Sequence, residues 1–383
     1  MVSKALLVGI NLYLIRKLAV DEYSHFTALL NVIFLGYQLA CGPLERLYIA
    51  EHDRYHAHLT TLRWILGGLS ALGVIIWLRN DIDRPDAALI LVGVLLLSSY
   101  QVIRIRLQQR LEFTMFSVAE VLKNTLWLVL LVLLIGTSFV PTGTVPLITL
   151  LAATVLAMLV LKIMLKSSDR PPLPPAGARS VGQVLWDTRY VVAYSLVGAI
   201  IPYLPVLMAV ADGHDTTTAT YGAAMRYQAI LGMAVFAVNT VLLPQMAALG
   251  SDRQQRTALM KSMTKAAPLI LGVFAVTVLV IWVGIPYVDQ GKYPLLPVTF
   301  LILSVTPALS LIGAPYINVL LIDGRARSVL ACMCAAVGIN LLAFRLLGGS
   351  TNPLAPAIAS VLAYLTITVA VIGCASAGSQ QST

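Results

Sequence analysis

Few charged side chains interrupt the long apolar segments of this sequence, and four of them are cations suited to holding an anion. Arg226 and Lys123 lie inside apolar segments, and Arg46 and Arg189 lie close to the ends of two others. A guanidinium group forms forked hydrogen bonds to phosphate or carboxylate oxygens, and charge within a membrane-spanning helix usually has a function. We therefore predict that these four residues bind an anionic substrate.

Two of these cations also have structural interpretations. Arg226 can pair with a buried carboxylate or extend its head to the membrane surface. Lys123 follows Glu120 by one helical turn, so the two can neutralise each other and lower the cost of insertion. In the alternative interpretation, Lys123 contacts the headgroup of a substrate while Glu120 couples transport to a proton or sodium ion.

Acidic residues accompany the other two cations. Glu45 precedes Arg46, and Asp187 lies just before Arg189. Such pairs can anchor helix ends at the membrane interface. Alternatively, they form a cytoplasmic gate whose ion pairs break and re-form during a transport cycle, and Glu45 and Asp187 are candidates for that role.

Prolines are concentrated in two apolar segments of the second half of the chain. They are Pro202 and Pro205 in the first, and Pro297, Pro307 and Pro315 in the second. A proline within a helix removes one backbone hydrogen bond and bends the helix. We predict that these two helices bend during a transport cycle, with Pro307 as a coupling or gating residue.

Cysteine and histidine show no spacing typical of a metal site. The cysteines Cys41, Cys332, Cys334 and Cys374 all fall in apolar segments, and the histidines His52, His56 and His58 share one polar loop, where solvation is favoured over metal binding. We predict no metal site, no catalytic residue and no cofactor.

The elements that must position these residues are membrane helices. Hydrophobic residues make up 58% of the chain and charged residues only 11%, far below the roughly 25% of a soluble domain. The apolar residues form segments long enough to cross a bilayer as helices, which predicts an all-α polytopic membrane protein with about twelve transmembrane helices. The predicted spans are 4–18, 26–44, 62–79, 87–103, 115–137, 144–165, 184–210, 219–248, 266–288, 295–322, 327–347 and 353–375.

The longest polar stretch divides the chain into two halves. Residues 167–182 are rich in proline and predict a cytoplasmic linker between a six-helix lobe at 1–166 and another at 183–383. Lys and Arg are concentrated in the loops that lie inside if both termini are cytoplasmic, which predicts that orientation.

The two halves also echo each other. Tyr100 and Asn124 have the same separation as Tyr316 and Asn340. Equivalent helices in two halves are typical of transporters. The two asparagines are expected to make hydrogen bonds between helices.

The net charge of +9 fits basic loops that face anionic lipid. No loop is long enough for a nucleic-acid recognition module, so we predict a membrane-lipid partner and no nucleic acid. Short loops also leave little room for an integral membrane enzyme such as a polysaccharide polymerase or glycosyltransferase, which remains the less favoured alternative.

Four short stretches carry motifs that recur in one family. They are residues 16–26 (RKLAVDEYSHF), 107–124 (LQQRLEFTMFSVAEVLKN), 221–226 (YGAAMR, followed by Pro244) and 289–293 (DQGKY). Together they resemble the polysaccharide flippases of the MOP superfamily of exporters, in particular the Wzx-like flippases for O-antigen or exopolysaccharide.

The resemblance implies two six-helix lobes facing a central cavity and working by alternating access. It also implies a substrate, an undecaprenyl-pyrophosphate-linked oligosaccharide crossing the bacterial inner membrane. A polysaccharide polymerase and a chain-length regulator would be partners. The alternative is a MATE-like cation-coupled multidrug exporter of the same fold. Such exporters rely on acidic residues deep in their spans, and only Glu120 is clearly mid-membrane here.

Overall fold

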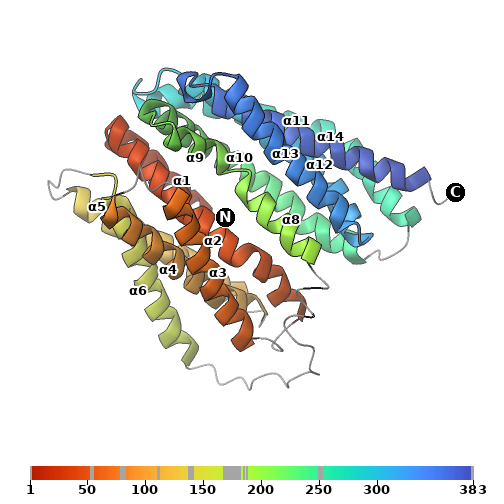
Figure 1. Ribbon diagram of the computed structural model, residues 1–383, viewed down its shortest axis with the longest axis horizontal. Helices are drawn as coiled ribbons and strands as arrows, with labels where there is room; N and C mark the ends of the chain where they lie inside the picture. Colours follow the sequence, from red (N-terminus) through yellow and green to blue (C-terminus); the bar gives the residue numbers. More distant parts are fainter. Residues whose placement is uncertain are drawn as a thin grey trace. The chain divides into compact units, whose positions relative to one another are not determined.

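The computed structural model describes most of the chain. The described residues are 2–51, 56–77, 83–109, 113–136, 142–166, 183, 186, 189–248 and 253–380. Within them, every regular element is a helix, as predicted (Figure 1). The contacts divide the chain into two compact units, Met1–Tyr203 and Leu204–Thr383.

The first unit contains seven of the described helices. They are α1 (Val2–Lys17), α2 (Val20–Glu51), α3 (His56–Trp77), α4 (Arg84–Gln109), α5 (Phe113–Gly136), α6 (Val145–Lys166) and α8 (Arg189–Ile200). By its contacts α8 belongs here, since it packs on α2. The proposed linker 167–182 lies outside the described residues, so the boundary predicted there stays a prediction.

The second unit contains the remaining described elements. They are α9 (Leu204–Ala211), α10 (Asp215–Ala248), α11 (Arg253–Asp289), α12 (Leu296–Ile322), α13 (Ala326–Leu346), the 3-10 turn η2 (Gly349–Thr351) and α14 (Ala355–Gln380). Every predicted span therefore contains a helix, and the seventh is divided between α8 and α9 by a turn that includes Pro202.

Length and composition identify a multi-pass membrane protein. Eight of the described helices are long and apolar enough to cross a bilayer, and α8 with α9 would be a ninth. Helices α1, α3 and α10 occupy the other three predicted positions. On α11, Leu269, Val273, Val276 and Val280 form one face and are each more than 60% exposed. A soluble protein rarely exposes such a stripe, whereas lipid covers it without cost.

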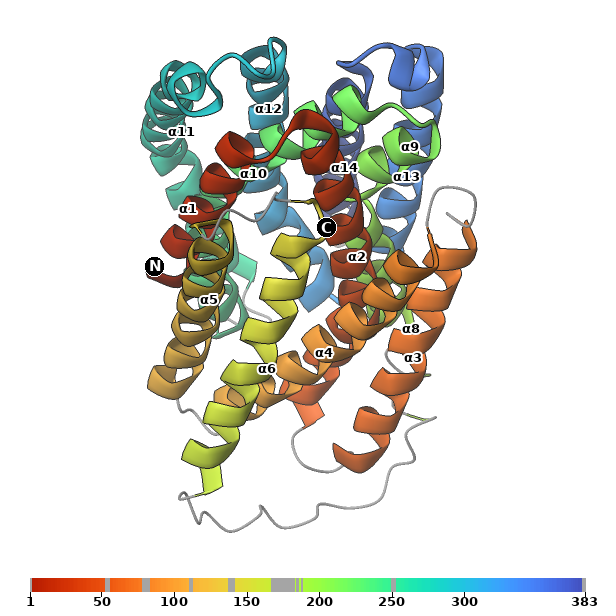
Figure 2. The same cartoon turned by 90° about the vertical axis from the view of Figure 1, so that its left-hand side faces the viewer.

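Helix α2 occupies the centre of the first unit, where it packs on α3, α4 and α8. A Cβ added to Gly36 of α2 would lie 2.6 Å from Val94 of α4, and one added to Gly93 of α4 would lie 2.9 Å from Ile33 of α2. Small residues thus let the two backbones approach each other closely. The unit is completed by α5, which lies beside α6 (Figure 2) and also contacts α1.

Helix α12 occupies the centre of the second unit. It packs on α10, α11, α13 and α14, and α13 and α14 lie side by side (Figure 1). Gly313 of α12 lies against Thr368 of α14, whose hydroxyl donates to the Leu309 carbonyl oxygen at 3.2 Å. Pro307 and Pro315 both lie inside this helix, and Pro297 lies in its first turn.

Candidate functional site

Three charged side chains meet between α4 and α5 in the first unit. The Arg104 Nη1 atom lies 3.1 Å from Glu120 Oε1, and the Lys123 Nζ atom lies 3.4 Å from the same oxygen. The side chains are only 15–20% exposed. Two cations thus share one carboxylate, and the cluster carries one positive charge in excess.

Neighbouring side chains hold the two cations in place. Arg104 donates to Gln101 Oε1 at 2.7 Å, and its guanidinium group lies 4.5 Å from the centre of the Phe116 ring. The Lys123 ammonium group lies 4.9 Å from the centre of the Tyr100 ring. Cation–π contacts of this kind stabilise a charge that has left bulk water.

The start of α1 closes the cluster from another side. Asn124 Nδ2 donates to the carbonyl oxygen of Ser3 at 2.8 Å and to its hydroxyl at 3.1 Å. The predicted interhelical role of Asn124 is therefore confirmed, and so is that of Asn340, which donates to the Ala359 carbonyl oxygen at 3.4 Å.

Arg226 of α10 is the charged residue of interest in the second unit. Its Nε and Nη2 atoms are buried, and neither has a hydrogen-bond partner among the residues that the structure describes. Within the same residues, no carboxylate forms an ion pair with it. A buried donor without a partner costs about 1–3 kcal/mol, and more when it is charged. Arg226 is therefore suited to receive an anion.

A short polar chain links α10 to the proline of α12. Gln228 Nε2 donates to the Thr306 hydroxyl, and that hydroxyl donates to the Leu303 carbonyl oxygen at 2.9 Å. Pro307 has no N–H to offer this carbonyl, which lies four residues before it. Thr306 supplies the missing donor and Gln228 orients its hydroxyl, so the Leu303 carbonyl oxygen is satisfied within the protein.

The other predicted site residues have different surroundings. Arg189 is exposed at the start of α8, where it donates to the Trp186 carbonyl oxygen at 2.7 Å. Its guanidinium group lies 4.5 Å from the Trp186 ring centre and 4.8 Å from that of Tyr190. These contacts are typical of interfacial anchoring. Arg46 and Glu45 fall within α2, but their side chains, and Asp187 altogether, lie outside the described residues.

Two arginines that were not among the predicted site residues lie inside the helical packing. Arg104 belongs to the cluster, and Arg63 of α3 is only 3% exposed and donates to the Ser98 carbonyl oxygen of α4 at 3.1 Å. Both lie within a residue or two of the end of a predicted apolar segment. Had the predicted helices been extended past the ends of these apolar segments, both arginines would have been identified as residues within the helical packing.

Known proteins resemble this chain in fold and not in sequence. No family model and no curated protein matches this sequence. Among solved structures, an inward-facing multidrug resistance MATE family transporter of the MOP superfamily matches with a TM-score of 0.70 and 14% identity, over 100% of this chain and 96% of that one. The chain has the fold of a MOP superfamily transporter.

A second match is a lipid flippase. The lipid II flippase MurJ, in an inward closed conformation, matches with a TM-score of 0.67 and 12% identity, over 97% of this chain and 85% of that one. An outward-facing MATE family transporter matches with a TM-score of 0.61 and 13% identity, over 100% of this chain and 94% of that one. The MATE/MOP-like fold expected from the sequence is thus confirmed, and a fold shared by a drug transporter and a lipid flippase leaves the substrate to be argued from side chains.

Proposed function

We propose that this protein is a flippase that moves undecaprenyl-pyrophosphate-linked oligosaccharide units across the bacterial inner membrane by alternating access. The observation that carries the proposal is the excess of cations within the apolar helices. Arg104 and Lys123 outnumber Glu120 in the first unit, and in the second the Arg226 donors have no partner among the described residues. A pyrophosphate headgroup supplies the negative charge that both places lack.

The same observation weighs against a cation-coupled drug exporter. Such a transporter needs a carboxylate free to exchange a proton or sodium ion with a cationic drug. Glu120, the acidic residue that the sequence placed within a span, is engaged by Arg104 and Lys123. In our proposal Glu120 therefore limits the repulsion between the two cations, so coupling ions would have to act elsewhere.

Similarity in fold keeps the exporter as the second candidate. The MATE family transporter has the highest TM-score of the three structures compared, and the lipid II flippase MurJ has the next highest. The two candidates differ in the charge of the substrate. Arg226 with open donors favours an anion.

The proposed cycle assigns the cations to headgroup binding and Pro307 to bending. With both termini in the cytoplasm, the Arg104 cluster lies toward the inner end of α4 and would meet the headgroup first. A membrane-bound polymerase and a chain-length regulator are the partners that would use the delivered units.

Deletion of the gene tests the proposal directly. Lipid-linked repeat units should accumulate in the inner leaflet, and surface polysaccharide should fall, because the units no longer cross. Radiolabelled lipid extracts and a glycan stain measure the two effects. Normal surface polysaccharide together with increased drug sensitivity would favour the exporter instead.

A further inference from the structure

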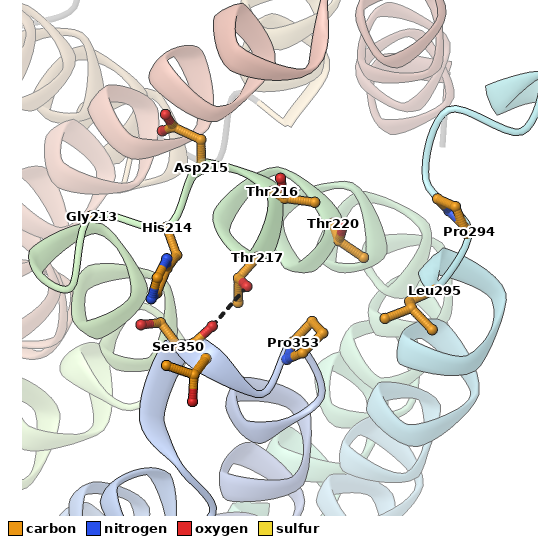
Figure 3. Close-up of a pocket in the computed structure, with 11 residues that line it drawn as sticks. Gly213, His214, Asp215, Thr216, Thr217, Thr220, Pro294, Leu295, Ser350 and Pro353 are labelled. Carbon is orange, nitrogen blue, oxygen red and sulfur yellow. Dashed lines mark hydrogen bonds between the residues drawn. The ribbon is translucent and has the colours of Figure 1, made fainter.

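A pocket of about 600 Å³ opens where three turns of the second unit meet (Figure 3). Its walls come from residues 213–217 at the start of α10, 294–295 before α12, and 350–353 before α14. The volume falls within the roughly 300–1,000 Å³ of small-molecule sites. None of the charged residues discussed above lines it.

The lining combines many hydroxyl groups with a few apolar faces. Thr216, Thr217, Thr220, Ser350 and Thr351 provide the hydroxyls. Asp215 and His214 add a carboxylate and an imidazole, and Pro294, Leu295 and Pro353 provide the apolar faces (Figure 3). No lysine or arginine is among the lining residues, so this pocket is poorly suited to a pyrophosphate.

The turn that forms one wall is fixed by polar contacts. The Asp212 carboxylate accepts from the Ser350 hydroxyl at 3.1 Å and from its backbone N–H at 3.4 Å. The Thr217 hydroxyl donates to the Ser350 carbonyl oxygen at 3.0 Å, and Gly348 and Gly349 adopt positive φ angles in the same turn. A site held in this way needs little reorganisation to bind a ligand.

One hydroxyl on the floor of the pocket has no partner. Thr220 is 3% exposed and lines the pocket, yet its side chain makes no hydrogen bond with any residue that the structure describes. Thr217, one turn earlier on the same helix, shows the usual arrangement, since its hydroxyl is satisfied within the protein. A buried hydroxyl that faces a cavity without a partner is available to a ligand.

We propose that this pocket binds a neutral pyranose ring. Sugar hydroxyls would exchange hydrogen bonds with Thr220 and Thr216, while the C–H face of the ring would pack on Pro294 or Pro353. The three turns lie at the end of the helices predicted to face outside. If the proposed flippase function holds, on which this role rests, the pocket receives a sugar of the oligosaccharide after it has crossed.

Binding of sugars to the purified full-length protein in detergent tests the site. The probes are the methyl glycosides of glucose, galactose and mannose, followed by saturation-transfer NMR. We expect transfer to at least one glycoside, and its loss in Thr216→Trp, which fills the pocket from an exposed position. Thr220→Val keeps the shape of the side chain and should weaken binding about five-fold, as loss of one hydrogen bond does.

A matched control separates this effect from general damage to the protein. Thr366 of α14 is half-buried, lies outside the pocket and bonds to the Leu362 carbonyl oxygen of its own helix, so Thr366→Val should leave sugar binding unchanged. Absence of transfer in the wild type, or equal transfer in Thr216→Trp, overturns the proposal. Sugar binding needs no transport, so a failed deletion phenotype would remove the flippase function and leave this site standing.

Discussion

The two units pack their helices in corresponding pairs, yet they carry charge in different ways. In the first unit α2 packs on α4, α4 on α6, and α5 on α6; in the second α10 packs on α12, α12 on α14, and α13 on α14. Asn124 of α5 and Asn340 of α13 are both buried and both donate to a neighbouring helix. The buried asparagine therefore recurs on the corresponding helix of each unit, although Asn124 donates to α1 and Asn340 donates to α14, the counterpart of α6.

Aligning the two asparagines shows where the units differ. Glu120 lies one turn before Asn124, and the corresponding residue of α13 is Ala336, which is fully buried. Lys123 directly precedes Asn124, whereas Ile339 directly precedes Asn340. The same helix packing is thus compatible with charged residues at these two positions in α5 and with apolar residues at the corresponding positions in α13. The second unit instead carries its cation on α10, as Arg226.

The largest effect on transport is expected from Arg226→Ala. The variant removes a cation that has open donors and no partner among the described residues, so substrate binding should be lost while the folded state keeps its stability. Complementation of surface polysaccharide in the deletion strain measures the first effect. Thermal unfolding in detergent measures the second.

Arg226→Lys is the matched control for that variant. It keeps the charge but loses the fork of donors, so it should restore transport only in part. Full complementation by Arg226→Ala would remove Arg226 from the substrate site and leave the second unit without a binding cation.

Glu120→Gln should destabilise the first unit and leave the second unit unchanged. It leaves Arg104 and Lys123 facing each other without their shared carboxylate, and removing one partner of a buried ion pair costs about 3–5 kcal/mol. The expected result is a large fall in the free energy of unfolding, measured by denaturation in detergent.

A second change should reverse much of this loss. The double variant Glu120→Gln/Lys123→Gln removes one of the two repelling cations, so its stability should exceed that of Glu120→Gln alone. If the single variant is stable but inactive, Glu120 is a coupling residue and the cluster has been misinterpreted.

The sequence predicted the fold well because hydrophobic length is enough to locate membrane helices. Every predicted span contains a helix, including the weak first one at α1. The cluster was only half predicted: the spacing of Glu120 and Lys123 on one helix face indicated their pairing, but Arg104 joins them from another helix. No periodicity within one segment records such a contact, and the same holds for Thr220, whose open hydroxyl depends on three separate turns.

Pro307→Ala should have an intermediate effect, confined to transport. The interior of α12 contains two prolines, whereas α4, its counterpart in the first unit, has none beyond Pro85 in its first turn. Alanine would restore the backbone hydrogen bond to Leu303 and stiffen the helix, so stability should be kept or slightly raised. Transport rates in proteoliposomes should fall. Unchanged rates would show that bending at this proline is not needed.

Arg189→Ala should have the smallest effect of the series. Arg189 is exposed, and its contacts are with Trp186 and Tyr190 beside it in the sequence. An exposed cation–π contact contributes about 0.5–1 kcal/mol, so we expect a small loss of stability and nearly normal complementation. A loss of transport equal to that of Arg226→Ala, with the protein still folded, would instead assign Arg189 to the substrate path. The first unit would then contribute a second cation to that path, independent of the one that Glu120 balances.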